Sequence, residues 1–442
     1  KTNDVYFFDA VEFETIIEHY LSIAKHSLAK KAVQLGLEQH PSSIQLKLMK
    51  VELLIFEDEL KEASKMLKAI EAIDAYNDEV FIQKALILSK KKQHIEAIKI
   101  LKESLSFIED PSDIWSMLGM EYLYLDDFEN ARLNFEKCVE ADYEDYSSLY
   151  NIVYCFDMQE KHIQAIKFLN EYVDVNPYSE VAWHQLGKQY VILKKYKKAL
   201  TAYDFAIISD DTFVGAYLER GKVLEKLKRY EDAIENYNVS LQLEDPTSFA
   251  LLRIGNCYEK LNNDELAVQY YYRTVHEDPL LDKGWIAITK FYHKKRNYQK
   301  ALYYINKAIN IDTENVIYWK LYSQINQRLN FYEEAERGYK KTLELGNYEL
   351  NTWLSRGDLL IKLGEPQAAI FNFEQATDFY PDSAELEYRL AGLYFSLNEN
   401  DKGTFYLKNG LKHNEEYNFI IEELFPEVSN KILVKNLLKI NL

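Results

Sequence analysis

An alanine that recurs every 34 residues limits the fold of this chain more than any other feature of its sequence. Alanine holds the same place in eleven successive 34-residue segments, and only the twelfth segment differs, with Gly403. The alanines are Ala29, Ala63, Ala97, Ala131, Ala165, Ala199, Ala233, Ala267, Ala301, Ala335 and Ala369. A fixed period of this length indicates stacked, repeated units rather than one compact core.

The repeated segments follow one another without insertion over residues 10–417. The first covers residues 10–43, and the twelfth covers residues 384–417. All five tryptophans stand at the fourth place of a segment: Trp115, Trp183, Trp285, Trp319 and Trp353. We therefore expect one continuous repeat domain at 10–417, with residues 1–9 as a lead-in and residues 418–442 as a C-terminal tail.

Each segment has the apolar spacing of two amphipathic helices. Positions 4, 7, 8 and 11 of the segment share one helical face, and positions 20, 24 and 27 share another. Small residues at positions 8 and 20, such as Gly187 and Ala199, let the two helices approach closely. One pair cannot bury its own apolar face, so pairs must stack. The predicted fold class is all-α, an α-solenoid of stacked antiparallel helix pairs.

One segment carries a complete family motif. Its residues Trp115, Leu118, Gly119, Tyr122, Ala131 and Phe135 have the spacing W-x2-L-G-x2-Y…A-x3-F. The chain therefore resembles tetratricopeptide repeat (TPR) proteins, with twelve consecutive repeats. The resemblance implies a right-handed superhelix whose concave surface is lined by the first helix of each pair, chiefly through positions 2, 5, 9, 12 and 13.

Five residues depart from the family pattern. They are Lys47 and Glu387 at the fourth position, Asn326 at position 11, and Ile70 and Tyr172 at position 27. We expect these residues to change local packing without changing the fold.

The tail at 418–442 is expected to form capping helices over the last repeat. Its apolar residues include Phe419, Ile420, Ile421, Leu424 and Phe425, and Ser429 is predicted to cap the N-terminus of a following helix. A helix that forms a homodimer or docks a partner is the alternative.

The sequence lacks the common catalytic and metal-binding motifs. It contains no phosphate-binding loop, no H-E-x-x-H and no G-x-S-x-G. His94 and His162 fall on the turn between two helices, where we expect a solvated role, and the three cysteines, Cys138, Cys155 and Cys257, are expected to be reduced and packed. We predict no enzymatic activity, no metal and no cofactor.

The charge balance argues against several partner classes. The chain has 53 basic and 71 acidic side chains, a net charge of −18, which disfavours a general grip on nucleic acid or anionic membrane. It also has no apolar run near the roughly 20 residues that cross a bilayer. We expect a cytoplasmic protein, with a removed leader as the alternative because the chain begins at Lys1.

The groove positions that the resemblance implies change character along the chain. In segments three to five they are largely apolar: Ile82, Leu86, Met120, Leu123, Tyr124, Tyr150 and Tyr154. In segments six to ten, position 9 holds Lys188, Lys222, Asn256, Lys290 and Gln324, and position 5 begins with His184. This column resembles the groove with which some TPR domains hold a peptide's terminal carboxylate. Position 13 adds the basic residues Lys226, Lys260, Lys294, Arg328 and Lys362.

The predicted partner-binding groove consists of Tyr150, Tyr154, His184, Lys188, Lys222, Asn256, Lys290 and Gln324. Exposed tyrosines are typical binding anchors, and lysine and asparagine donate several hydrogen bonds. Packing between repeats and ordinary solvation of a polar face are the alternatives. The first functional hypothesis is a non-enzymatic scaffold that binds a protein or peptide segment. An RNA-binding helical-repeat protein is the second, and a regulatory subunit of an enzyme or of an envelope-assembly complex is a special case of the first.

Overall fold

The computed structural model describes residues 7–439 except for 75–76, 107, 109 and 245–246, and within them every regular element is a helix. The chain divides into two compact units, residues 1–223 (unit 1) and residues 224–442 (unit 2). The prediction of an all-α chain is confirmed for the described residues. One continuous domain and a right-handed superhelix stay predictions.

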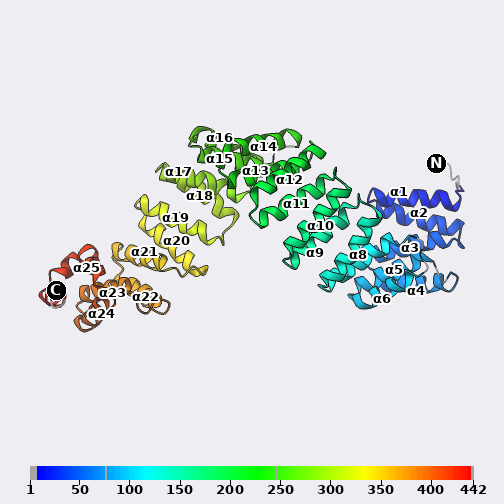
Figure 1. The fold of residues 1–442 in the computed structure, drawn as a ribbon. Coiled ribbons are helices and arrows are strands. Elements are labelled where there is room, and N and C mark those ends of the chain that lie inside the picture. The colour runs from blue at the N-terminus through cyan, green and yellow to red at the C-terminus, as the bar shows by residue number, and fades with distance from the viewer. Residues whose placement is uncertain (1–6, 75–76, 107, 109, 245–246, 440–442) are drawn as a thin grey trace, which may run out of the picture. The chain divides into compact units, whose positions relative to one another are not determined.

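Unit 1 consists of consecutive helix pairs (Figure 1). They are α1 (Ala10–Ser22), α2 (His26–Gln39), α3 (Ile44–Phe56), α4 (Leu60–Glu71), α5 (Asp78–Lys90), α6 (His94–Ser104), α7 (Ser112–Tyr124), α8 (Phe128–Ala141), α9 (Tyr146–Met158), α10 (His162–Val175), α11 (Glu180–Ile192) and α12 (Tyr196–Ser209). The boundary between the units falls within α13 (Val214–Lys226).

Unit 2 continues the pairing. Its helices are α14 (Tyr230–Leu243), α15 (Ser248–Lys260), α16 (Asp264–Glu277), α17 (Asp282–Lys294), α18 (Tyr298–Ile311), α19 (Val316–Arg328), α20 (Tyr332–Glu344), α21 (Leu350–Lys362), α22 (Pro366–Thr377), α23 (Ala384–Ser396) and α24 (Asn400–His413). A 3-10 turn η1 (Glu415–Asn418) and the short helices α25 (Phe419–Leu424), α26 (Pro426–Ser429) and α27 (Ile432–Lys439) follow.

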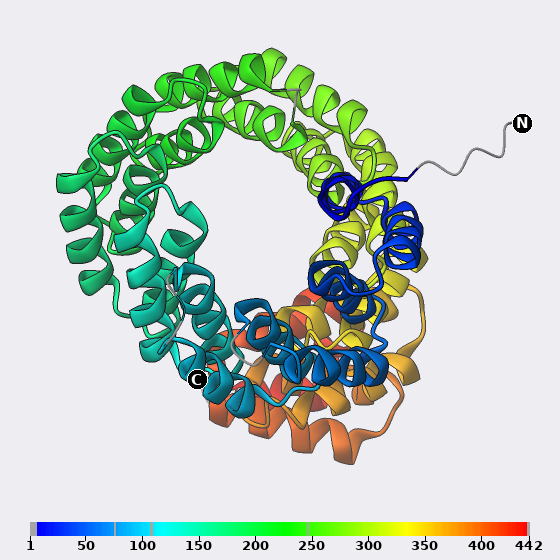
Figure 2. The ribbon, with the colours of Figure 1, turned by 90° about the vertical axis from the view of Figure 1, so that its right-hand side faces the viewer.

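The helix starts keep the period of the sequence. In unit 1 the first helices begin 34 residues apart, as at Ser112 and Tyr146, and unit 2 has the same interval, as at Ser248 and Asp282. Within each unit the helices lie in two layers (Figure 2). The apolar spacing therefore predicted both the helices and their pairing.

Position 15 of the repeat ends the first helix of each pair in a left-handed conformation. Eleven non-glycine residues there have φ between 55° and 65°: Ala24, Asp58, Lys92, Asp126, Glu160, Lys194, Lys228, Asn262, Arg296, Asn330 and Asn398. Gly364 holds the same place with φ 75°. A hydrogen bond closes the turn, as from the Asp127 N–H to the Tyr122 carbonyl at 2.9 Å. This bond offsets part of the strain of left-handed backbone in residues with a side chain.

The close helix approach predicted at position 8 is confirmed. A Cβ on Gly119 would lie 2.5 Å from Phe135 Cζ, and one on Gly357 would lie 2.1 Å from Phe373 Cζ. Both phenylalanines are buried. Only glycine admits these rings, which fill the space between the two helices of a pair.

The departures from the family pattern have local partners. Buried Asn326 donates from Nδ2 to the Tyr322 carbonyl at 2.9 Å, and buried Tyr172 donates its hydroxyl to the Tyr143 carbonyl. Glu387 is also buried and accepts a hydrogen bond from His413 Nδ1 at 2.8 Å. A satisfied polar group costs little inside a protein, so these residues fit without changing the helices.

The tail packs on α23. Ile420, Ile421 and Phe425 are buried, and a Cβ on Gly392 would lie 2.1 Å from Phe425 Cδ2. Ser429 is the last residue of α26, and its hydroxyl donates back to the Pro426 carbonyl at 2.9 Å. The prediction that Ser429 caps the following helix is therefore wrong.

The two histidines predicted to lie on inter-helix turns, His94 and His162, are the first residues of α6 and α10, and their side chains are partly buried. His94 Nδ1 lies 2.8 Å from Oε2 of buried Glu121, and His162 Nδ1 lies 3.1 Å from Oε1 of buried Gln189. Each pair joins the second helix of one repeat to the first helix of the next. The prediction of a solvated role is corrected in part: both rings keep some exposure, but position 10 of the following repeat supplies each with a buried polar partner.

Candidate functional site

Five of the seven groove positions predicted to be apolar form an exposed face on three first helices of unit 1, whereas Ile82 and Leu123 pack against the core. Leu86 on α5, Met120 and Tyr124 on α7, and Tyr150 and Tyr154 on α9 are each more than one-third exposed. We call these five residues the aromatic face. Large apolar side chains at the same repeat positions of successive helices are typical of surfaces that bind other proteins.

Two rings of the aromatic face rest on rings from neighbouring helices. The centroid of Tyr124 lies 5.0 Å from that of His94, and Tyr154 meets Phe128 edge to face at 6.3 Å. Burial of part of the ring raises the pKa of Tyr150, so its phenol is neutral. These contacts limit the motion of exposed rings and reduce the entropy that binding would cost.

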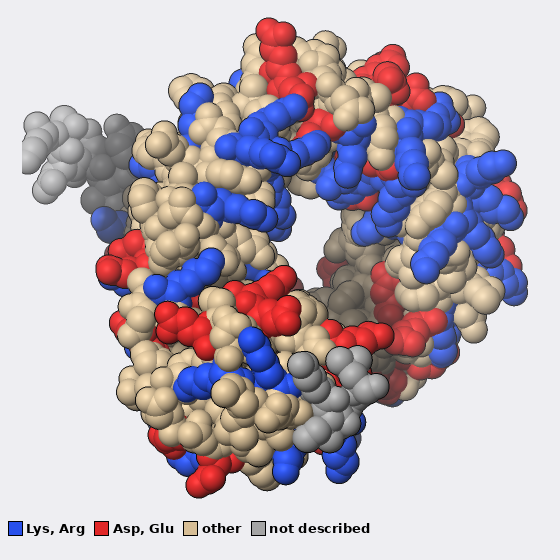
Figure 3. All heavy atoms as spheres, turned by 90° about the vertical axis from the view of Figure 1, so that its left-hand side faces the viewer, with Lys and Arg blue, Asp and Glu red and all other residues tan. Residues whose placement is uncertain are grey.

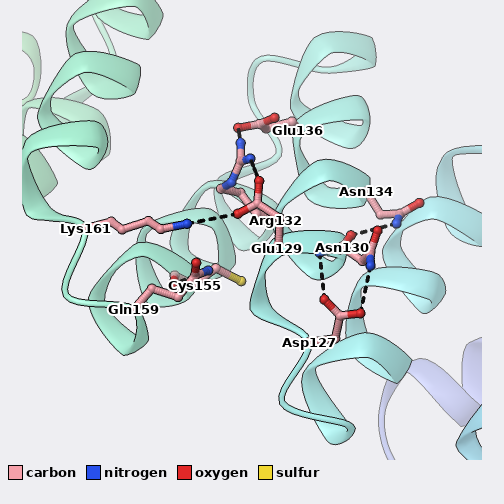
Figure 4. A network of polar contacts seen from close by, with 9 residues as sticks. All are labelled: Asp127, Glu129, Asn130, Arg132, Asn134, Glu136, Cys155, Gln159 and Lys161. Atoms are coloured by element: carbon pink, nitrogen blue, oxygen red, sulfur yellow. Dashed lines mark hydrogen bonds and ion pairs between the residues drawn. The ribbon is translucent and has the colours of Figure 1, made fainter.

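A network of charges lies on the second helices next to this face. Arg132 on α8 bonds Glu129 at 2.6 Å and also bonds Glu136, and Lys161, just before α10, reaches Glu129 at 3.2 Å (Figure 4). The bond from Arg132 is the main cause that lowers the pKa of Glu129. Nearby, burial raises the pKa of the Cys155 thiol to about 11, so the thiol is neutral. The network joins α8 to the turn before α10.

His184, which the sequence places at a groove position, has its ring nitrogens buried. Its ring centroid lies 5.8 Å from that of Tyr203 and 5.2 Å from that of Phe213. Neither nitrogen has a hydrogen-bond partner among the described residues. Burial, with the charges of Lys188 and Lys222, lowers the pKa of His184 to about 4. At pH 7 the imidazole is therefore neutral and packs between aromatic rings.

The lysines near His184 differ from each other. Lys188 is exposed, whereas Lys222 is half-buried and bonds Glu219 at 2.6 Å. A carboxylate ligand would have to compete with Glu219 for Lys222. Lys188 is the more accessible cation of the two.

The remaining predicted groove residues belong to unit 2. Asn256 is half-buried and accepts a hydrogen bond from the Tyr271 hydroxyl at 3.0 Å. Lys290 and Gln324 are exposed. The role of the predicted column as a ligand site stays a prediction.

Comparison with known families agrees with this repeat geometry. Models of the tetratricopeptide repeat family match residues 112–145, 185–248, 249–280 and 350–383. The chain is a tetratricopeptide repeat protein. The matches cover part of the repeats that the sequence predicts, so the number of twelve stays a prediction.

The relatives of this TPR protein share short stretches with it. Anaphase-promoting complex subunit 3 of Schizosaccharomyces pombe is 24% identical over 149 residues, which are 34% of this chain and 22% of the relative. The protein CTR9 homolog of Arabidopsis thaliana is 38% identical over 56 residues, 13% of this chain and 5% of the relative. The chain thus spans less than a quarter of the length of either relative.

One solved structure is similar to about half of this chain. The C-terminal part of a TPR protein from Cytophaga hutchinsonii is 18% identical, with a TM-score of 0.45, over 52% of this chain and 95% of that chain.

The described part of this TPR protein contains neither a candidate metal site nor a candidate membrane-spanning helix. Its His, Cys, Asp and Glu side chains form no group of three or more that could hold a metal ion. Its helices include none that combines the length and the apolar character needed to cross a membrane.

The cavities of unit 2 were not predicted from the sequence, and one of them includes residues of the predicted groove. This open cavity of about 580 Å³ is lined by His293, Gln324, Gln327, Arg328, Asn330, Tyr332, Tyr339, Ser355 and Lys362. Gln324 was predicted as a groove residue, and Arg328 and Lys362 belong to the basic column at position 13. The cavity itself depends on how four helices place their side chains, for which the sequence carries no direct signal.

Proposed function

We propose that this TPR protein is a non-enzymatic scaffold that binds a segment of a partner protein on the first helices of its repeats. The observation that carries the proposal is the aromatic face on α5, α7 and α9. Tyrosine and methionine contribute large contact areas and are enriched where proteins bind each other. The exposed residues of the predicted column, Lys188, Lys290 and Gln324, would supply polar contacts to the same kind of ligand.

The comparisons support an interaction role. One relative is by name a subunit of the anaphase-promoting complex, a protein that works within an assembly. A regulatory subunit of an enzyme, or of an envelope-assembly complex, is a special case of the same proposal. The partner's identity, a cytoplasmic location and a homodimer through the tail belong to the proposal as well.

RNA binding is the weaker candidate. The net charge of −18 opposes contact with a phosphate backbone, which dominates the affinity of most RNA-binding surfaces. Filter binding at low salt separates the two candidates. Nanomolar RNA affinity with a steep salt dependence would favour RNA over protein.

The proposal is tested by removing two rings of the aromatic face. The variant Tyr124→Ala/Tyr154→Ala and the intact chain are used to capture proteins, which are then quantified by mass spectrometry. We expect recovery of the specific partner to fall at least about tenfold, because truncating two anchors removes a few kcal/mol of binding energy.

The matched control is Ile163→Ala/Ile208→Ala. These isoleucines are exposed on the second helices α10 and α12 of the same unit. The control should recover the partner as the intact chain does. Equal recovery with the Tyr124→Ala/Tyr154→Ala variant would show that the aromatic face is not the binding surface.

A further inference from the structure

The cavity in unit 2 combines positive charge with an absence of carboxylates. Arg328 at the end of α19 and Lys362 at the end of α21 line it, and none of the described lining residues is Asp or Glu. In an acidic chain, a cavity with this lining is a local site of positive potential. Figure 3 shows Lys and Arg side chains gathered near one another over part of the surface.

Neither Arg328 nor Lys362 forms an ion pair with a described acidic residue. The lysine at position 13 of the preceding repeat does form one. Lys294, 34 residues before Arg328, bonds Glu259 at 3.2 Å. An adjoining hollow, which shares Asn330 and Tyr332 with the cavity, is lined by Glu333 and Glu334. Glu334 already accepts hydrogen bonds from Tyr322 at 3.0 Å and from Arg337 at 3.1 Å.

Neighbouring groups hold the cavity's polar lining in place. Lys362 Nζ lies 5.4 Å from the ring centroid of Tyr332, and the Tyr332 hydroxyl donates to Asn330 Oδ1 at 2.8 Å. The Tyr339 hydroxyl donates to Gln327 Oε1 at 3.4 Å. A lining held in advance loses less entropy when it binds a ligand.

His293 adds a neutral donor. Burial, together with the charge of Arg328, lowers the pKa of His293, so the imidazole is uncharged at pH 7. An imidazole N–H can still donate a hydrogen bond. The cavity therefore offers two cations and several neutral polar groups from α17, α19, α20 and α21.

We propose that this cavity binds an oxyanion, a carboxylate or a phosphate, carried by a side chain of the partner segment. The proposal rests on the scaffold function and specifies the chemistry of the partner. Arginine and lysine form charge-assisted hydrogen bonds with both anions, and the lining itself supplies no competing carboxylate. A volume of about 580 Å³ accommodates a side chain with the adjoining backbone.

The test measures the binding of two fluorescein-labelled peptides to the full chain by fluorescence anisotropy. One peptide is hexaglutamate, and the other carries one phosphoserine and is otherwise uncharged. The variant Arg328→Glu/Lys362→Glu is compared with Lys260→Glu/Lys294→Glu, which makes the same charge change at the same repeat position outside the cavity. We expect the cavity variant to lose at least about tenfold in affinity and the control less than about threefold, because the two lysines of the control do not line the cavity.

The outcomes are distinct. The peptide that binds more tightly identifies carboxylate or phosphate as the source, and competition by millimolar inorganic phosphate on the intact chain but not on the cavity variant supports the site. Equal loss in both variants, or no binding of either peptide, would overturn the proposal.

Failure of the site can be told apart from failure of the scaffold function. The variant Tyr124→Ala/Tyr154→Ala should bind the peptides normally because it changes only the aromatic face. If that variant loses the captured partner while Arg328→Glu/Lys362→Glu binds the peptides as tightly as the intact chain does, the scaffold function stands and the oxyanion site is wrong.

Discussion

The interiors of unit 1 and unit 2 are packed in the same way, but the two units differ at the positions that face solvent. Phe135 in unit 1 and Phe373 in unit 2 both fill the space left by a position-8 glycine. At the solvent-facing positions of the first helices, unit 1 exposes Tyr154 whereas unit 2 places Arg328 beside a polar cavity. The repeat pattern therefore determines the fold, and the residues outside that pattern distinguish one binding surface from another.

The units also differ in how they bury polar groups. His184 in unit 1 has no hydrogen-bond partner for its ring nitrogens among the described residues. Glu387 in unit 2 accepts a hydrogen bond from His413. The pKa of His184 is lowered and that of Glu387 is raised, in both cases mainly by burial, so acid should affect the two sites in opposite directions.

Because the two interiors are packed alike, equivalent core substitutions should lower the free energy of unfolding equally in the two units. We expect Phe135→Ala and Phe373→Ala each to lower the free energy of unfolding of its own unit by about 3–5 kcal/mol, because each removes a buried ring and leaves a cavity. Urea denaturation measures the loss, and hydrogen exchange shows which unit opens.

The matched controls are exposed rings of the second helices, Phe205→Ala on α12 and Phe371→Ala on α22. They should change stability much less than the buried rings. If Phe135→Ala opened unit 2 as readily as unit 1, or if the two losses differed severalfold, the two interiors would not be equivalent.

The sequence was sufficient to predict the packing that the two interiors have in common. The 34-residue spacing located the helix starts, and small residues at position 8 predicted contacts such as that between Gly119 and Phe135. The left-handed turn at position 15 could not be predicted, because residues as different as Ala24 and Glu160 adopt it. There the tertiary frame overrides the local preference of the residue.

The candidate sites were harder to predict because they also depend on tertiary contacts. The exposure of Tyr150 and Tyr154 followed from their place on the first helix. The burial of His184 depends on Phe213, which lies 29 residues later at the end of the same repeat, and the cavity beside Arg328 needs side chains from several helices. Such sites arise from side chains that are far apart in the sequence, and a single position in the repeat does not reveal them.

The buried imidazole predicts that acid weakens unit 1. A lowered pKa means that the stability His184 contributes is complete above the unfolded pKa of 6.5 and is lost as pH falls toward about 4. We compare the free energies of unfolding of His184→Phe and the native chain at each pH. The difference, variant minus native, should be larger at pH 4.5 than at pH 7 by about 2–3 kcal/mol. Denaturation at the two pH values, with hydrogen exchange in α11, measures this.

The control for this prediction is His162→Phe. His162 bonds Gln189, so its loss leaves a buried amide oxygen unsatisfied and should destabilise the protein at pH 7. His184→Leu is a second replacement that does not titrate, for use if the phenylalanine ring does not fit. If neither replacement of His184 reduced the loss of stability in acid, the imidazole would not be the group that titrates.

The smallest expected effect is at Glu387, and its sign is opposite to that of His184. Its pKa is raised by burial, and His413 offsets part of that rise, so the stability it contributes is complete below the unfolded pKa and is lost as pH rises through the folded one. Glu387→Gln keeps the volume and an acceptor for His413 but does not titrate. Between pH 4 and pH 7 the native chain should therefore lose stability relative to Glu387→Gln, by less than the His184 effect because a hydrogen bond compensates the buried carboxylate. Hydrogen exchange in α23 localises the change to unit 2, and a flat or reversed difference would mean that the two units do not respond to acid in opposite ways.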